Sequence, residues 1–310
     1  MIDPTIISAI IYANCITLLS IGFTLTYMTS RIPNFAQGTL AMVGACISLM
    51  ACINGYNPYW FMPVASIIVG AFCFAIYKVV LSVLKARGAT EISLTISTLA
   101  IEMLLYSLIN IIIDVLQKTM KVYLQSFSLR FFDFSIFDLP GVLLISTICS
   151  VSLIIFLNFI LTKSKFGIAM RAAVENPFLA EVLGVDVDMI SAISWLLTGC
   201  LSGFSGSLLP LWFHVNTAQG ITLLITIFAA SVLGGFSSIQ GAIIGGYLVG
   251  FSEIFLTYIF TRILGSWVTS YRPLFPLAIM IVMLLVCPTG VSALSKEIRN
   301  VLSRVRRREK

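Results

Sequence analysis

Two carboxylates interrupt long apolar runs of the sequence, at Glu102 and Glu253. A charged carboxylate inside a lipid bilayer is costly unless it is paired, hydrated or protonated. One interpretation is that each acid lines a water-filled route, where it relays protons or binds a polar solute. The other is that each forms a hydrogen bond to a neighbouring helix. The residue types alone leave both interpretations open.

Several neutral polar side chains lie near the ends of these runs. Asn34 and Gln37 stand where the second run begins, so they either line a polar mouth or cap a helix. Thr95 and Ser97 lie in the fourth run, where hydroxyls commonly bond back to their own helix. The candidates for a polar path through the membrane are therefore Asn34, Gln37, Thr95, Ser97, Glu102 and Glu253.

Little in the sequence supports an enzyme. Ser205 lies in Gly-Phe-Ser-Gly-Ser, which lacks the last glycine of the G-x-S-x-G nucleophile turn. The chain has one histidine, His214, and its seven cysteines include no C-x-x-C pair. We predict no catalytic residue and no metal site.

The elements that must position these residues are transmembrane helices. Of the 310 residues, 59% are hydrophobic and 10% are charged, against about 25% charged in an ordinary soluble domain. Mean hydropathy is +1.04. This composition excludes a cytosolic enzyme domain, a disordered tail and a secreted disulfide scaffold. The predicted fold is an all-α, polytopic transmembrane bundle.

The apolar runs predict about eight to ten spans. The seventh run is short and is either a span or a half-helix. The nine runs fall at about 5–28, 37–53, 61–84, 92–113, 140–162, 189–213, 221–235, 240–261 and 273–290. A transmembrane domain over 1–295 and a basic tail over 296–310 follow from this pattern.

Glycine spacing within the runs indicates close helix packing, or alternatively a dimer interface. The pairs are Gly199 with Gly203 and Gly241 with Gly245. Gln37-Gly38 and Gln240-Gly241 each open a glycine-bearing run, which is a possible trace of an internal repeat.

Positive charge predicts the orientation. With nine spans, 14 of the 19 Lys and Arg residues fall on one side, which is expected to be cytoplasmic. The N-terminus is then outside and the C-terminus is cytoplasmic, with the basic tail against anionic lipid headgroups. The net charge of +6 follows from this topology, so no nucleic-acid partner is expected.

Two connections are longer than the others, an outer one at 114–139 and an inner one at 163–188. The inner connection contains an apolar helical stripe, and then Asn176 and Pro177 as an N-cap and first helical residue. Gly184 supplies a stop. The short helix so defined carries a second apolar face, formed by Leu179, Val182 and Leu183. That face either packs on the chain's own bundle or contacts a cytoplasmic partner.

Two stretches resemble a known family. Gly167-x3-Arg171-Ala172-x2-Glu175-Asn176-x3-Ala180-x3-Gly184 is similar to the coupling loop of ABC-importer permeases, and most similar to the branched-chain amino-acid branch. Asn34-Phe-Ala-Gln37-Gly38-x3-Met42-x-Gly44-Ala45 is similar to the motif that opens the second span of the first permease subunit in that system. Gln37 stands where that branch commonly has histidine.

The resemblance implies a permease subunit of an ATP-driven importer in the cell membrane. Its implied partners are two ABC ATPase subunits, a second homologous permease and an extracytoplasmic substrate-binding protein. ATP would bind the ATPases and no cofactor would bind this chain, which has no G-x-x-x-x-G-K-[ST] loop. The expected cargo is a branched-chain or other hydrophobic amino acid. Alternatives are a sugar, urea or amide permease, or an ATP-independent secondary transporter.

The resemblance also assigns roles within the coupling loop. Arg171 is expected to be a charged anchor, either on the partner or within the loop. Gly167 permits close approach at the end of the fifth span, and Pro177 and Gly184 fix the helix ends. The full predicted coupling set is Gly167, Arg171, Ala172, Glu175, Asn176, Pro177, Ala180 and Gly184.

Overall fold

A computed structural model describes residues 3–121, 125–136, 139–286 and 290. The basic tail at 296–310 lies outside the described residues. The α-helices in chain order are α1 (Pro4–Ser30), α2 (Gln37–Ile53), α3 (Pro58–Ile76), α4 (Ser82–Ala86), α5 (Glu91–Met120), α6 (Gly141–Lys163), α7 (Lys165–Glu175), α8 (Pro177–Val182), α9 (Val187–Trp212), α10 (Gln219–Gly234), α11 (Ile239–Leu264) and α12 (Leu274–Val286).

Short elements complete the described chain. A π-helical turn, η1 (Tyr77–Leu81), joins α3 to α4, and the 3-10 turns are η2 (Arg130–Phe132) and η3 (Ser266–Tyr271). Two antiparallel pairs of two-residue strands are present. Strand β1 (Ser126–Phe127) pairs with β4 (Val215–Asn216), and β2 (Ser135–Ile136) pairs with β3 (Leu139–Pro140).

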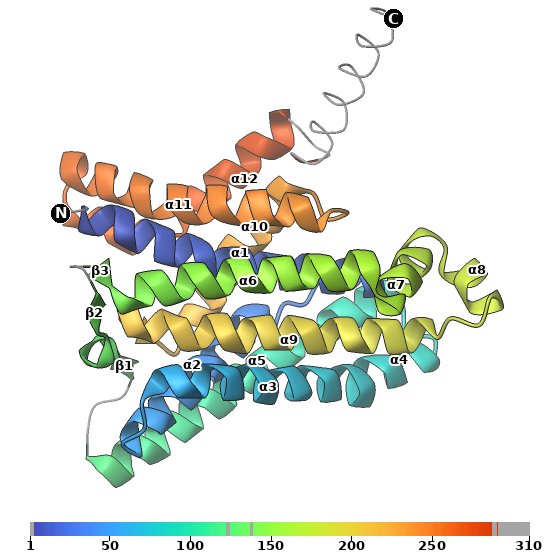
Figure 1. Ribbon diagram of the computed structural model, residues 1–310, viewed down its shortest axis with the longest axis horizontal. Helices are drawn as coiled ribbons and strands as arrows, with labels where there is room; N and C mark the ends of the chain where they lie inside the picture. The colour runs from blue at the N-terminus through green and yellow to red at the C-terminus, as the bar shows by residue number, and fades with distance from the viewer. Residues whose placement is uncertain (1–2, 122–124, 137–138, 287–289, 291–310) are drawn as a thin grey trace, which may run out of the picture.

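The predicted helical membrane bundle is confirmed. Six helical segments are long and apolar enough to span a membrane: α1, α3 with α4, α5, α6, α9 and α11. The apolar helices α2, α10 and α12 are shorter, and the short seventh run of the sequence corresponds to α10. The long helices lie along one axis, with α7 and α8 at one end and the strands and N-terminus at the other (Figure 1).

The connection between α5 and α6, predicted over 114–139, is shorter than the sequence predicted. Helix α5 continues to Met120, so the non-helical segment starts at Lys121 instead of near 114. The reason is that the apolar residues Val115 and Leu116 extend the helical run. Asp114 and Lys118, four residues apart, also lie on one helix face, where opposite charges favour a helix.

Helices α1 and α9 form the centre of the bundle. In their most apolar stretches 83% and 67% of residues are buried, against 22% to 28% in the other four long segments. The two helices run antiparallel, because Trp212 Nε1 donates to Ser8 Oγ at one end and Ser191 Oγ donates to the carbonyl oxygen of Thr29 at the other.

Glycines place each central helix against a peripheral one. A Cβ atom on Gly203 of α9 would lie 2.5 Å from the carbonyl oxygen of Ala65 on α3, and one on Gly199 would lie 2.5 Å from the Cβ of Cys73. Helix α1 packs in the same way against Gly246 of α11, whose Cβ would lie 2.5 Å from the Thr17 Cα.

The second predicted glycine pair lies between α10 and α11. A Cβ on Gly245 would lie 2.1 Å from the carbonyl oxygen of Ala230, and a Cβ on Gly234 would lie 2.4 Å from the backbone of Gly241. Both predicted pairs therefore contact neighbouring helices of the same chain.

The starts of α2 and α10 resemble each other. Helices α2 and α10 both start with the triplet Ala-Gln-Gly, at 36–38 and 218–220, and the two starts touch. A Cβ on Gly38 would lie 2.0 Å from the carbonyl oxygen of Gly220. Gln37 and Gln219 are each the first residue of a short helix, whereas Gln240 is the second residue of the long helix α11.

Candidate translocation path and coupling loop

The start of α2 carries a buried hydrogen-bonded network. The Gln37 amide nitrogen donates to Ser202 Oγ at 2.8 Å and to the carbonyl oxygen of Leu19 at 3.4 Å. Asn34 Nδ2 donates to Gln37 Oε1 at 3.1 Å. Asn34 and Gln37 are fully buried. The network therefore joins α1, α2 and α9 inside the bundle.

Glu102 reaches the same helix start from α5. Its Oε1 accepts a hydrogen bond from Thr39 Oγ1 at 3.2 Å, and Glu102 is 9% exposed. Thr98, one turn earlier on α5, donates to the carbonyl oxygen of Pro33 at 3.1 Å. The structure thus brings Asn34, Gln37 and Glu102 together around the first turn of α2.

Thr95 and Ser97 lie elsewhere. Both are half-buried, and each hydroxyl donates to its own helix, to the carbonyl oxygens of Glu91 and Ser93, at 2.8 Å. They share α5 with Glu102 but do not join the network at the start of α2.

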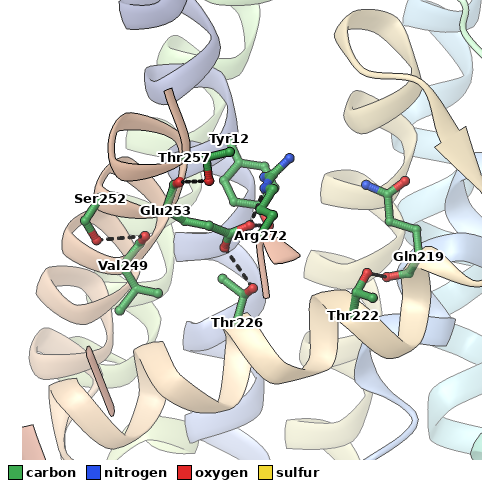
Figure 2. Close-up of polar contacts among 9 residues, drawn as sticks. All are labelled: Tyr12, Gln219, Thr222, Thr226, Val249, Ser252, Glu253, Thr257 and Arg272. Carbon is green, nitrogen blue, oxygen red and sulfur yellow. Dashed lines mark hydrogen bonds and ion pairs between the residues drawn. The ribbon is translucent and has the colours of Figure 1, made fainter. Parts of the chain in front are cut away.

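Glu253 anchors a second cluster, separate from Glu102. Its Oε1 accepts hydrogen bonds from Tyr12 Oη at 3.0 Å and Arg272 Nε at 2.5 Å, and its Oε2 accepts one from Thr226 Oγ1 at 2.8 Å (Figure 2). Glu253 is 3% exposed. The cluster therefore ties α1, α10 and α11 to the segment that precedes α12.

Arg272 is the functional candidate that sequence reasoning missed. Arg272 is one of the five basic residues outside the predicted cytoplasmic set of 14. Its side chain pairs with Glu253 and lies over the Tyr12 ring, 4.3 Å from the ring centre. Burial lowers the pKa of Arg272, but the neighbouring Tyr12 and Glu253 raise it by more, so its pKa lies above the ordinary value. In the sequence, the signal for this role was a single arginine immediately before the last apolar run.

One nitrogen of Arg272 is left without a partner. Its Nη2 is buried and makes no hydrogen bond to the described residues. A buried donor without an acceptor costs about 1–3 kcal/mol. The cluster therefore contains one buried hydrogen-bond donor that no described residue satisfies.

The connection between α6 and α9 folds as two short helices, α7 and α8, at the end of the bundle opposite the N-terminus (Figure 1). As predicted, Asn176 caps α8, with its Oδ1 accepting from the backbone nitrogen of Leu179 at 3.1 Å, and Pro177 is the first helical residue. Gly184 follows the helix with a φ of +85°, which favours glycine.

Two residues hold α7 against the end of α6. A Cβ on Gly167 would lie 2.2 Å from the carbonyl oxygen of Leu161, so this position requires glycine. Arg171 Nη1 donates to the same carbonyl oxygen at 3.1 Å. Arg171 thus anchors the loop to its own helix α6.

The α7–α8 loop presents one buried and one exposed face. Met170, Ala173 and Ala180 are buried against the bundle, and Ala172 is half-buried. Glu175 is exposed. The large apolar side chains of α8 and the residue after it are also exposed: Phe178 77%, Leu179 54%, Val182 69% and Leu183 74%. This exposed face is called the α8 tip below.

Residues weighed for other chemistry have structural contacts. Ser205 Oγ donates to the carbonyl oxygen of Cys15 at 3.0 Å, and His214 is exposed. Among the described residues, no group of three or more His, Cys, Asp or Glu side chains is placed to hold a metal ion.

Comparison with known proteins identifies the family. Residues 5–284 match the family described as "Branched-chain amino acid transport system / permease component". The chain belongs to this family. The permease is therefore a multi-pass membrane transport subunit and not an enzyme, which confirms the resemblance seen in the coupling loop and at the start of α2.

Curated relatives agree. The permease is 40% identical over 95% of its length, and 94% of the relative's, to a "Probable branched-chain amino acid transport permease protein LivH" from Methanocaldococcus jannaschii. It is 27% identical to the "High-affinity branched-chain amino acid transport system permease protein LivH" of Escherichia coli, covering 88% and 90% of the two chains. A solved structure, "PsaBC from Streptococcus pneumoniae in complex with Fab", shares the fold, with a TM-score of 0.55, 14% identity, and 95% and 96% coverage.

The Gln37 network gives a first prediction. Gln37→Leu is expected to leave the buried Nδ2 of Asn34 without its acceptor and Ser202 Oγ without its donor. The free energy of unfolding is expected to fall by about 1–3 kcal/mol. Gln37→His is expected to keep most of the stability, because imidazole both donates and accepts. Thermal unfolding of the solubilised variants checks this order. Equal melting temperatures for Gln37→Leu and the unmodified permease would contradict it.

Proposed function

We propose that the permease is the transmembrane subunit of an ATP-driven ABC importer for branched-chain or other hydrophobic amino acids. Its partners are two cytoplasmic ATPase subunits, a second homologous permease and an extracytoplasmic substrate-binding protein. ATP binds the ATPase subunits, and this chain binds no cofactor. Residues 1–295 form the transmembrane domain, and the coupling loop within it spans 163–188.

The α8 tip is the observation that carries this proposal. A helix of six residues is not stable alone, and here Asn176 and the buried Ala180 hold it in place. Phe178 and Leu183 are nevertheless exposed at the extreme end of the bundle, beyond the long helices (Figure 1). A rigid apolar projection of this kind suits insertion into a groove on a partner protein.

Charge supports an orientation in which this end is cytoplasmic. The C-terminal ends of α1, α4 and α6 lie near the α7–α8 loop. They carry the basic residues Arg31, Lys85, Arg87 and Lys163. Basic residues close to the ends of spans favour the cytoplasmic side. The N-terminus then lies outside and the C-terminus inside the cell, with the tail against anionic lipid.

The interior polar residues support a route between α2 and α10. Helix α2 begins at the buried Ala36, and α10 begins at Ala218, which is exposed and lines a cavity. Neither helix start has a capping side chain. Such helix starts carry partial positive charge and can stabilise the carboxylate of a passing amino acid. The proposed route passes Asn34, Gln37 and Glu102 at the start of α2 and Glu253 beside α10, with Thr95 and Ser97 on the flank of α5.

Amino acids are favoured over other cargo by the extent of the similarity. The branched-chain permeases match 88% or more of the chain. The "Autoinducer 2 import system permease protein LsrC" of Shigella flexneri matches only 43% of it. Sugar-like or amide cargo is therefore the less supported alternative.

Co-purification tests the proposal. Tagged permease extracted in mild detergent is expected to bring down a P-loop ATPase and a second permease, and membrane vesicles containing the complex are expected to take up leucine in the presence of ATP and the binding protein. Purification of the chain alone, with uptake that does not need ATP, would instead favour a secondary transporter.

A further inference from the structure

A cavity of about 350 Å³ opens beside the Glu253 cluster. It lies at the end of the bundle where α1 begins, β4 pairs with β1 and η3 precedes α12. Its wall includes Tyr12, Glu253 and Arg272 on one side. This end is the proposed extracytoplasmic side, where a binding protein would release its cargo.

Helix α10 provides the other wall. Gln219, Thr222 and Thr226 line the cavity, spaced three and four residues apart, so they share one face of the helix. Figure 2 shows Gln219 and Thr222 on the same helix as Thr226, which bonds Glu253. Leu223 and Pro273 add apolar surface. The cavity thus combines hydrogen-bonding groups with a smaller apolar part.

Arg272 is held in a way that leaves binding capacity unused. Its Nε donates to Glu253, while the second oxygen of Glu253 is taken by Thr226, so the two-bond contact that arginine commonly makes with a carboxylate is not formed. The buried Nη2 has no partner among the described residues. The Arg272 side chain as a whole is 24% exposed and lines the cavity, so a small rotation of the guanidinium would present this donor to it. A guanidinium placed in this way is suited to a second carboxylate.

The charges of the site balance. Glu253 and Arg272 together are neutral, and their side chains are 4% and 24% exposed. A ligand with a single charge would leave that charge uncompensated in a poorly hydrated site, which is costly. A ligand that carries one charge of each sign and no net charge would not.

We propose that this cavity binds the α-carboxylate and α-ammonium groups of a free amino acid, with the carboxylate on Arg272 and the ammonium on Glu253. Tyr12 and Thr226 position Glu253 for this role through their hydrogen bonds. The inference rests on the proposed function, and it specifies where the importer first holds its cargo.

Ligand analogues test the two charges separately. The measurement is equilibrium binding to the solubilised full chain with whatever subunits accompany it, using leucine, 4-methylpentanoate, which lacks the amine, and 3-methylbutylamine, which lacks the carboxylate. Leucine is expected to bind at least about tenfold more tightly than either analogue. Absence of leucine binding, or equal affinity for leucine and one analogue, would overturn the proposal.

A charge-neutral double variant locates the site. Glu253→Gln with Arg272→Gln avoids leaving a buried charge unpaired, and it is expected to weaken leucine binding by at least about tenfold. The matched control is Lys78→Gln with Asp188→Asn, which removes the other described ion pair, at the opposite end of the bundle. The control is expected to bind leucine as the unmodified chain does.

The remaining outcomes separate the two proposals. A Glu253/Arg272 double variant that binds leucine within about twofold of the unmodified chain would overturn the cavity assignment, whatever its partners. ATPase co-purification is read in the same preparations. If no ATPase co-purifies with the unmodified chain, the proposed importer is contradicted. The leucine-binding result is then judged separately.

Discussion

Replacing both Phe178 and Leu183 with glutamate is expected to abolish ATP-driven uptake while the permease still folds. The two side chains are 77% and 74% exposed, so the substitutions remove little packing from the chain itself. Burial of a large apolar side chain in an interface contributes about 1.5–3 kcal/mol, and a buried unpaired charge adds a further penalty. Two such losses correspond to well over a hundredfold weaker ATPase association.

The measurement is ATPase co-purification with the tagged permease, together with leucine uptake into vesicles. The control is Phe131→Glu, which places glutamate at a phenylalanine that is 95% exposed on the opposite end of the bundle. That variant is expected to retain the ATPase. Normal co-purification with the Phe178/Leu183 variant would show that the α8 tip is not the docking element.

Gly206→Ala is expected to destabilise the permease strongly. A Cβ on Gly206 of α9 would lie 1.8 Å from the carbonyl oxygen of Ala41 on α2, and ordinary contact begins at about 3.4 Å, so the two helices must move apart. Overpacking of this kind costs about 1–3 kcal/mol, and contact with backbone, which cannot rotate away, places the cost at the upper end. The better helix propensity of alanine returns only about 1 kcal/mol.

The displacement has a second consequence. Helix α2 also carries Gln37, whose bond to Ser202 spans the same interface. The expected result is a lower melting temperature and a lower level of folded protein in the membrane. Ser207→Ala is the matched control, because a Cβ is already accommodated there and the Ser207 hydroxyl donates to the carbonyl oxygen of Phe204 in its own helix. Equal stability of the two variants would show that α2 and α9 can separate at little cost.

The coupling loop could be predicted from the sequence because its signals are local. A cap, a proline and a glycine within nine residues determine where α8 begins and ends, and the structure has Asn176, Pro177 and Gly184 in those roles. Local patterning left open whether the apolar face of α8 packs on the bundle. Tertiary structure decided this, since Ala180 is buried and Phe178 is exposed.

The sequence alone also left open whether the Gln-Gly pairs mark an internal repeat. The pair Gln-Gly occurs at 37, 219 and 240, and a two-residue match does not distinguish among them. Only the helix boundaries show that positions 37 and 219 both open a short helix, and only the packing shows Gly38 against Gly220.

The sequence by itself determined that the chain is a helical membrane protein, where its apolar helices lie and the form of the α7–α8 loop, because hydropathy, periodicity and capping act over one to twenty residues. It did not determine which polar side chains meet. Glu253 and Arg272 are 19 residues apart, and Tyr12 is 241 residues from Glu253. Their contact follows from how α1, α10 and α11 pack, since the burial of a charged pair depends on the arrangement of whole helices, which no local pattern encodes.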